Sequence, residues 1–322
     1  MSPLFFVHIP KTAGTSFRLG AEDYFEKDNI LYDYGQKSPV TASAVKSFLY
    51  GDKKDFWGFK QTCMQHRTAM VGGHVNANRF ISLFGVDRTL TFLRDPLQRM
   101  ASEYFHFVRN YGFEGSFHDF YSRPIMHNRQ SKMLHGVDVE AIGFLGLTER
   151  YSKSLEIINS LYGVEIPHRE DNRGKSASEL MHEVSEKDVQ EFNQFNKQDI
   201  VMYERSTELF TLRYKAFREG KSWGHARLVE CKPSRLAGWA WWEGERDDPV
   251  DVEIWVNNEY LDTVLAVDFR PGLCRHLPPR GGYVGFHLPV KLSVGDKVQC
   301  RIGSTGQCFP IKPRSVTKPD AK

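Results

Sequence analysis

The sequence lacks the cysteine pattern of a zinc site or of a disulfide framework. Its five cysteines are an odd number, and no two of them form a CxxC pair. They are scattered through the chain, at Cys63, Cys231, Cys274, Cys300 and Cys308. We therefore expect reduced thiols with mostly structural roles.

The chain also lacks a long apolar run and a strong excess of charge. No segment approaches the ~20 apolar residues of a transmembrane helix. Ser2 and Pro3 lead into the first apolar run without a charged leader or a cleavage site. We therefore expect a cytoplasmic protein without a transmembrane segment. The net charge of +3 and the pI of about 8.5 suit an anionic ligand but are too weak to indicate nucleic acid.

Two patterns divide the 322 residues. Residues 1–220 alternate strand-like apolar runs with helical periodicity, which predicts an α/β domain with a P-loop-like parallel sheet flanked by helices. A polar stretch with glycine, Glu219–Gly224, marks a boundary. Short alternating strands then predict a small antiparallel β-sandwich over residues 225–312, and the polar residues 313–322 predict a disordered tail.

The most informative stretch is Leu4–Ser16, LFFVHIPKTAGTS, where an apolar run ends at Pro10 in a short turn with glycine. The run predicts a strand buried on both faces. Gly14 lets the backbone approach an oxyanion, and the start of a helix favours negative charge. Lys11 adds a positive charge, and hydroxyl groups come from Thr12, Thr15 and Ser16, the last two of which could cap the helix. The stretch predicts a phosphate-binding loop, with an ordinary helix cap as the alternative.

His74 is the candidate general base. It follows the strand-like residues 69–71 and the pair Gly72 and Gly73. Ligands of open α/β sheets bind at the carboxyl ends of the strands, and the near-neutral pKa of histidine suits proton transfer. A loop histidine with a hydrogen-bonding role is the alternative. His8 lies within the first strand, so we predict a structural role for it.

Arg94 is the second candidate for an anion site. It follows the apolar strand Thr89–Leu93 and precedes Asp95-Pro96, which starts a helix containing Ser102. The planar guanidinium group can bind a phosphate through two parallel hydrogen bonds. The alternatives are an Arg94 that pairs with Asp95 or a glutamate, and a Ser102 that is a small residue where helices touch.

Other polar residues are weaker candidates. We predict that Arg99 and Glu103 are solvated helix charges. Four residues are predicted either to line an anionic or sugar-bearing cleft or to lie on a surface helix: Asn128, Arg129, Gln130 and Lys132. Arg173 and Lys175 belong to a polar segment that contacts cofactor or acceptor, or is only solvated. Four tryptophans of the second domain either stack on sugar or, as we favour, fill its core: Trp239, Trp241, Trp242 and Trp255.

Three segments carry a resemblance to a known family. The order PKTAGTS resembles the 5′-phosphosulfate loop of sulfotransferases that use 3′-phosphoadenosine 5′-phosphosulfate (PAPS), particularly the carbohydrate group related to heparan sulfate 2-O-sulfotransferase. The pattern RDP followed by Ser102 resembles the 3′-phosphate site of these enzymes, and GHV resembles the segment with their catalytic base. The resemblance covers about Leu4 to Phe217 and implies a soluble sulfotransferase of the bacterial type. The second domain is similar to accessory modules of bacterial glycan-modifying enzymes.

The resemblance implies transfer of a sulfuryl group from PAPS to a hydroxyl of a carbohydrate, which leaves adenosine 3′,5′-bisphosphate (PAP). His74 would be the base, and Lys11 would assist the in-line transfer without a metal. The residues implied in cofactor binding are Lys11, Thr12, Ala13, Gly14, Thr15, Ser16, Arg94 and Ser102. The acceptor would be a polysaccharide, an oligosaccharide or a glycolipid, and the sequence does not indicate the oligomeric state.

Two other functions stay open. A nucleotide-dependent kinase needs a Gly-Lys-Ser/Thr ending with the lysine at the helix start and an acidic magnesium ligand. Here Lys11 precedes Gly14, and Asp95 is the only carboxylate next to a motif. The other alternative is a catalytically inactive protein whose β-sandwich binds glycan.

Overall fold

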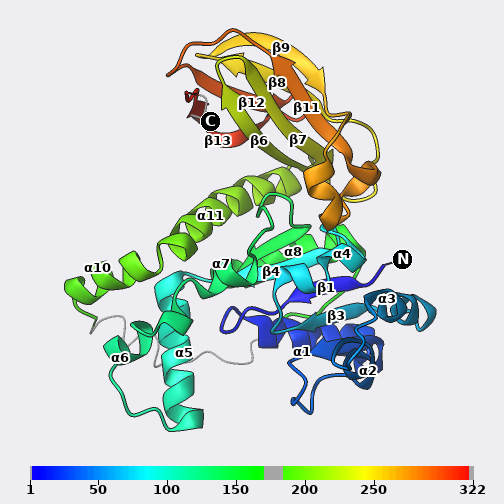
Figure 1. The fold of residues 1–322 in the computed structure, drawn as a ribbon, viewed down its shortest axis with the longest axis vertical. Coiled ribbons are helices and arrows are strands. Elements are labelled where there is room, and N and C mark those ends of the chain that lie inside the picture. The colour runs from blue at the N-terminus through cyan, green and yellow to red at the C-terminus, as the bar shows by residue number, and fades with distance from the viewer. Residues whose placement is uncertain (1, 170–183, 319–322) are drawn as a thin grey trace. The chain divides into compact units, whose positions relative to one another are not determined.

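The computed structural model describes residues 2–169 and 184–318 (Figure 1). The chain divides into two compact units. Unit 1 comprises Met1–Phe84 and Arg88–Phe210, and unit 2 comprises Gly85–Asp87 and Thr211–Lys322. Within the described ranges, no helix combines the length and the apolar character that crossing a bilayer requires.

Unit 1 contains a five-stranded parallel sheet with the strand order β2-β3-β1-β4-β5. The strands are β1 (Leu4–Val7), β2 (Ile30–Asp33), β3 (Met70–Gly73), β4 (Thr89–Leu93) and β5 (Phe144–Leu147). Every residue of β1, β3, β4 and β5 is buried, because helices cover both faces of the sheet (Figure 1). The predicted parallel α/β sheet is confirmed.

The strand order reverses direction between β1 and β4, at their carboxyl ends. After β1 the chain moves to one side of the sheet to form β2, and after β4 it moves to the other side to form β5. Connections that leave in opposite directions open the space where ligands bind in such sheets. The loop with Lys11 and the strand end with Arg94 both lie at this position.

Helices make up most of the rest of unit 1. They are α1 (Gly14–Phe25), α2 (Ser43–Leu49), α3 (Phe56–Gln65), α4 (Ile81–Phe84), α5 (Pro96–Tyr111), α6 (Phe117–Tyr121), α7 (Arg129–Met133), α8 (Tyr151–Tyr162), α10 (Glu186–Phe195) and α11 (Lys197–Arg218), the last of which continues into unit 2. The aromatic residues of Asp55–Lys60 are also compatible with a strand, but the structure has helix α3 here. Asp55 caps α3 by accepting a hydrogen bond from the Gly58 N–H at 2.7 Å, and the buried Phe59 and Cys63 are one helical turn apart.

Unit 2 consists of two four-stranded antiparallel sheets around one hydrophobic core, as in a β-sandwich. Their orders are β10-β11-β7-β6 and β13-β12-β8-β9. The strands are β6 (Gly224–Lys232), β7 (Arg235–Trp242), β8 (Asp251–Val256), β9 (Glu259–Leu265), β10 (Asp268–Phe269), β11 (Tyr283–Pro289), β12 (Lys297–Ile302) and β13 (Gln307–Ser315). The predicted all-β architecture is confirmed, but the sequence did not reveal β6, β10 and β13.

The end of the described chain differs from the predicted tail. Strand β13 continues to Ser315, and Val316 after it is buried, so the predicted disordered tail from residue 313 is wrong at its start. Residues 319–322 lie outside the described part of the chain. Pro310 and Pro313 concealed this strand, because proline removes a hydrogen-bond donor and is found mainly on edge strands such as β13.

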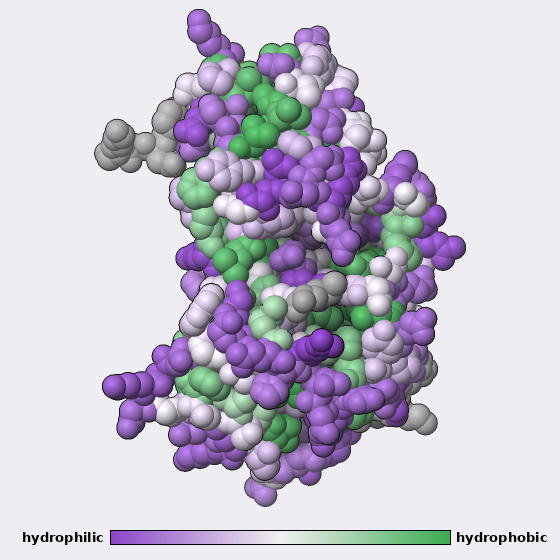
Figure 2. All heavy atoms as spheres, turned by 90° about the vertical axis from the view of Figure 1, so that its right-hand side faces the viewer, coloured by the Kyte–Doolittle hydropathy of each residue, from purple (hydrophilic) through white to green (hydrophobic). Residues whose placement is uncertain are grey.

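The tryptophans of unit 2 are mainly buried. Trp239, Trp241 and Trp242 are at most 2% exposed. Trp242 belongs to the hydrophobic core of unit 2, as predicted, whereas Trp239 and Trp241 stack on each other on the opposite face of β7. Trp255 is half-buried, and the guanidinium of Arg301 lies 4.3 Å from its ring centre. Figure 2 shows apolar residues gathered on one face of this unit. Its exposed apolar side chains include Tyr260, Leu265, Phe269 and Tyr283.

Candidate active site

The loop between β1 and α1 adopts a conformation that can surround an anion. Lys11 has φ 68° and Ala13 has φ 62°, so left-handed residues alternate along it. Such a backbone turns successive N–H groups toward one concave side. Ala13 is the N-terminal cap of α1 and provides no side-chain cap, so the first N–H groups of the helix can serve a ligand. Thr15 and Ser16 lie inside the first turn, and their predicted capping role is wrong.

Only a glycine fits at position 14, because the ring of His8 lies directly beside it. A Cβ atom at Gly14 would lie 2.1 Å from Cδ2 of His8, a distance that no side chain tolerates. From the sequence, this glycine is expected to let an oxyanion approach the backbone. The structure adds another reason, because the His8 ring occupies the space beside the start of α1.

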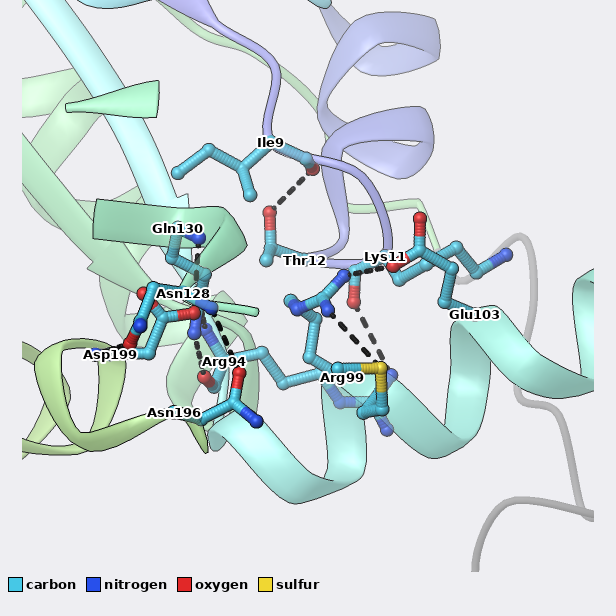
Figure 3. Close-up of polar contacts among 11 residues, drawn as sticks. Ile9, Lys11, Thr12, Arg94, Arg99, Glu103, Asn128, Gln130, Asn196 and Asp199 are labelled. Carbon is cyan, nitrogen blue, oxygen red and sulfur yellow. Dashed lines mark hydrogen bonds and ion pairs between the residues drawn. The ribbon is translucent and has the colours of Figure 1, made fainter. Parts of the chain in front are cut away.

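Thr12 uses its hydroxyl group within the loop. The side chain is buried, and Oγ1 donates a hydrogen bond to the Ile9 carbonyl at 2.9 Å (Figure 3). The predicted role of this hydroxyl as a phosphate donor therefore needs correction. What Thr12 can offer a phosphate is its backbone N–H, while its side chain holds the loop in shape.

Arg94 reaches from the end of β4 to this loop. Its Nη1 donates to the Lys11 carbonyl at 3.4 Å, and its Nε is buried without a hydrogen-bond partner among the described residues (Figure 3). Burial lowers the pKa of Arg94 from its ordinary value. Burying part of a guanidinium group without a paired carboxylate lowers the stability of the fold, unless an anion binds to the group.

The carboxylates next to Arg94 have other roles. Asp95 caps α5 by accepting a hydrogen bond from the Gln98 N–H at 2.9 Å. Glu149 accepts one from the Asp95 N–H, also at 2.9 Å. No ion pair between Arg94 and either carboxylate is among the described contacts, but the charges of Glu149 and Asp95 act on Arg94 and raise its pKa against the effect of burial.

Lys11 lies beside a buried ion pair on α5. Arg99 and Glu103 are 1% and 4% exposed, and the Arg99 Nη1 is 2.5 Å from the Glu103 Oε2. The prediction that both are solvated charges is wrong. Burial and the positive charge of Arg109 lower the pKa of Lys11, whereas the Glu103 carboxylate raises it. Glu103 thus helps to keep the ammonium group charged.

Ser102 lies on the same side of α5 as this pair. Residues 99, 102, 103 and 106 are spaced by three or four positions and share one helix face. His106 on that face experiences the charge of Lys11, which contributes to lowering its pKa after burial does. Ser102 itself is half-buried. At a rise of ~1.5 Å per residue, it lies about 9 Å along the helix from Pro96, the first residue of α5, so one phosphate contacts both Arg94 and Ser102 only if the arginine extends along the first turns of α5.

His74 has the hydrogen-bonding arrangement of a general base. Its Nδ1 lies 2.7 Å from the His8 carbonyl oxygen, which can only accept, so Nδ1 carries the proton and Nε2 has the free lone pair. The surrounding protein lowers the pKa of His74, although the outer edge of the residue is exposed. The hydrogen bond to the His8 carbonyl raises this pKa, and the charge of Arg129 lowers it again. The imidazole is therefore neutral at pH 7.

His8 is structural, in agreement with its prediction, but it also contacts the candidate base. Its ring is 6% exposed, and its Nδ1 is 2.8 Å from the Tyr34 hydroxyl. The ring centres of His8 and His74 are 4.4 Å apart. Burial places the pKa of His8 well below its ordinary value, with a smaller contribution from His74. The contact with Tyr34 had no signal in the sequence.

Three of the four polar residues predicted in the segment that begins at Asn128 form contacts with other parts of the protein. Gln130 is fully buried, Asn128 binds the backbone of α11, and the Lys132 ammonium donates to the Pro124 carbonyl. Arg129 is half-buried, and its charge acts on His74. The predicted contacts of Arg173 and Lys175 lie outside the described residues.

No protein-family model, curated protein or solved structure matches this chain. The function is therefore argued from the geometry of the site. Within the two described ranges, no group of three His, Cys, Asp or Glu side chains is arranged to hold a metal ion, and the predicted metal-free chemistry stays a prediction. The carboxyl ends of β3, β1 and β4 bring together a neutral imidazole, an ammonium group and a guanidinium group.

Proposed function

We propose that unit 1 transfers a sulfuryl group from PAPS to a hydroxyl group of a carbohydrate acceptor. The observation that carries this proposal is the position of Arg94, a half-buried guanidinium whose Nε has no hydrogen-bond partner among the described residues and whose Nη1 reaches the Lys11 carbonyl of the neighbouring loop. Two cations on adjacent strand ends suit a ligand with two separate phosphate groups. The resemblance of the three motifs to carbohydrate sulfotransferases supports PAPS as that ligand.

Each group then has a defined role in the reaction. Nε2 of His74 takes the proton of the acceptor hydroxyl as its oxygen attacks the sulfur. The bond between the sulfur and the bridging oxygen of the 5′-phosphate breaks, and PAP leaves. Lys11 and the N–H groups of the loop stabilise the negative charge that develops on the leaving oxygen. Arg94 and Ser102 hold the 3′-phosphate, which distinguishes PAPS from ATP.

Calorimetric titration tests this proposal. The wild-type chain is titrated with PAP and with ATP, and both titrations are repeated on Arg94→Ala. We expect a clear preference for PAP in the wild type and a loss of about 100-fold in PAP affinity in the variant, since removing a charged partner of a buried pair costs ~2–5 kcal/mol. Tight binding of ATP without a preference for PAP would instead favour a kinase.

A further inference from the structure

Gln130 is a buried glutamine whose side chain forms two hydrogen bonds with the backbone of Arg94. Its Oε1 accepts a hydrogen bond from the Arg94 N–H at 3.0 Å, and its Nε2 donates to the Arg94 carbonyl at 2.9 Å (Figure 3). Gln130 is fully buried, so water does not replace its side chain as the hydrogen-bond partner of the Arg94 N–H and carbonyl. The end of β4 is therefore fixed by one side chain from α7.

Gln130 is itself held by a reciprocal cap between α7 and α11. The Asp199 carboxylate accepts hydrogen bonds from the N–H groups of Gln130 and Ser131, at 3.0 and 2.7 Å. In return, Oδ1 of Asn128 accepts from the N–H groups of Gln198 and Asp199, at 3.0 and 3.2 Å. Each helix thus satisfies the free donors at the start of the other, and the position of Gln130 is determined by both.

We infer that Gln130 is a positioning residue for the phosphate-binding guanidinium of Arg94. It does not face the ligand, since its two polar side-chain atoms are used on the Arg94 backbone. Without these two hydrogen bonds, the backbone of Arg94 would regain torsional freedom, and its guanidinium group would no longer be held next to Lys11. This inference rests on the proposed function, because it concerns the 3′-phosphate that Arg94 is proposed to bind.

The test compares two nucleotides on Gln130→Met, which keeps the length of the side chain and removes both hydrogen bonds. PAP carries the 3′-phosphate, and AMP lacks it. We expect PAP affinity to fall about tenfold, a factor typical of losing one or two hydrogen bonds, and AMP affinity to stay unchanged. In an Arg94→Ala background, Gln130→Met should cause no further loss. Gln130→Glu keeps the acceptor for the Arg94 N–H and should recover part of the affinity.

Gln307→Met is the matched control. The Gln307 side chain forms the same pair of hydrogen bonds with the Gly224 backbone of unit 2, at 2.9 and 2.6 Å. Its replacement should change neither the PAP affinity nor the AMP affinity. Equal losses for PAP and AMP in Gln130→Met would indicate a merely structural role and overturn the inference, as would a further loss on top of Arg94→Ala. A wild-type chain that does not prefer PAP to AMP would instead overturn the proposed function, and the inference with it.

Discussion

Replacing Glu103 with leucine should destabilise unit 1 strongly, because Arg99 would keep its charge in a buried position. The side chains of Arg99 and Glu103 are 1% and 6% exposed and in direct contact. Removing one partner of a buried ion pair costs ~3–5 kcal/mol. A solvated pair at the same helical spacing contributes only ~0.3–0.5 kcal/mol. The two interpretations of these residues therefore differ by at least about 2.5 kcal/mol in the free energy of unfolding.

Hydrogen exchange of the α5 amides, followed by mass spectrometry, measures this difference locally. A loss of 3 kcal/mol accelerates exchange through unfolding by more than about 100-fold. The matched control is Glu219→Leu, because Lys215 and Glu219 have the same spacing but are 73% and 39% exposed. If α5 in Glu103→Leu exchanged as slowly as in the wild type, the pair would be solvated and the reasoning refuted.

The double variant Arg99→Met/Glu103→Leu separates stability from function. Replacing both members of a buried pair with apolar residues of similar size is often neutral or stabilising, so exchange in α5 should return toward the wild-type rate. The carboxylate that raises the pKa of Lys11 is still missing. Lys11 should then lose its proton at a lower pH than in the wild type, and PAP binding should weaken at that lower pH.

Three further predictions concern the histidine pair. His74→Ala should keep PAP affinity but lower turnover by ~10²–10⁴-fold, and unchanged turnover would exclude His74 as the base. Because the pKa of His74 is lowered, the acidic limb of the wild-type pH–rate profile should lie below the ordinary histidine value of about 6.5; a limb above it would contradict the proposed environment. Gly14→Ala should reduce stability by ~1–3 kcal/mol, since its Cβ would overlap His8. Thermal unfolding measures this loss, with Gly272→Ala as the control, because a Cβ at Gly272 meets no atom and its φ is not positive. A loss no larger than in that control would show that His8 moves freely.

The strongest apolar patterns predicted the fold of unit 1 well. Strand β4 was expected with its observed bounds, because five consecutive residues suited to a strand lie between polar neighbours. The first residues of α3 resemble a strand in the sequence, because Phe56, Trp57 and Phe59 have high strand propensity. Tertiary packing and the Asp55 cap decided in favour of the helix. Propensity alone could not anticipate either interaction.

The sequence identified the candidate site through motif residues but missed the residues that support them. Arg99 and Glu103 looked like an ordinary i,i+4 pair, since spacing along a helix does not tell a buried face from a solvated one. Gln130 had no signal beyond its place in a polar segment. Its function arises from contacts with Arg94 and Asp199, which are 36 and 69 residues away. Such long-range contacts have no counterpart in local periodicity.

The meeting of Lys11, His74 and Arg94 depends on the strand order more than on any motif. Each residue follows a strand, and the sequence shows this much for all three. Strand β1 pairs with β3 on one side and with β4 on the other, and the three strands are parallel, so their carboxyl ends lie at one edge of the sheet. Adjacent strands are ~4.8 Å apart, which places the three strand ends within about 10 Å of one another. If β1 lay at an edge of the sheet, one of these residues would be a further strand away, and the loop could not share a ligand with both of the others.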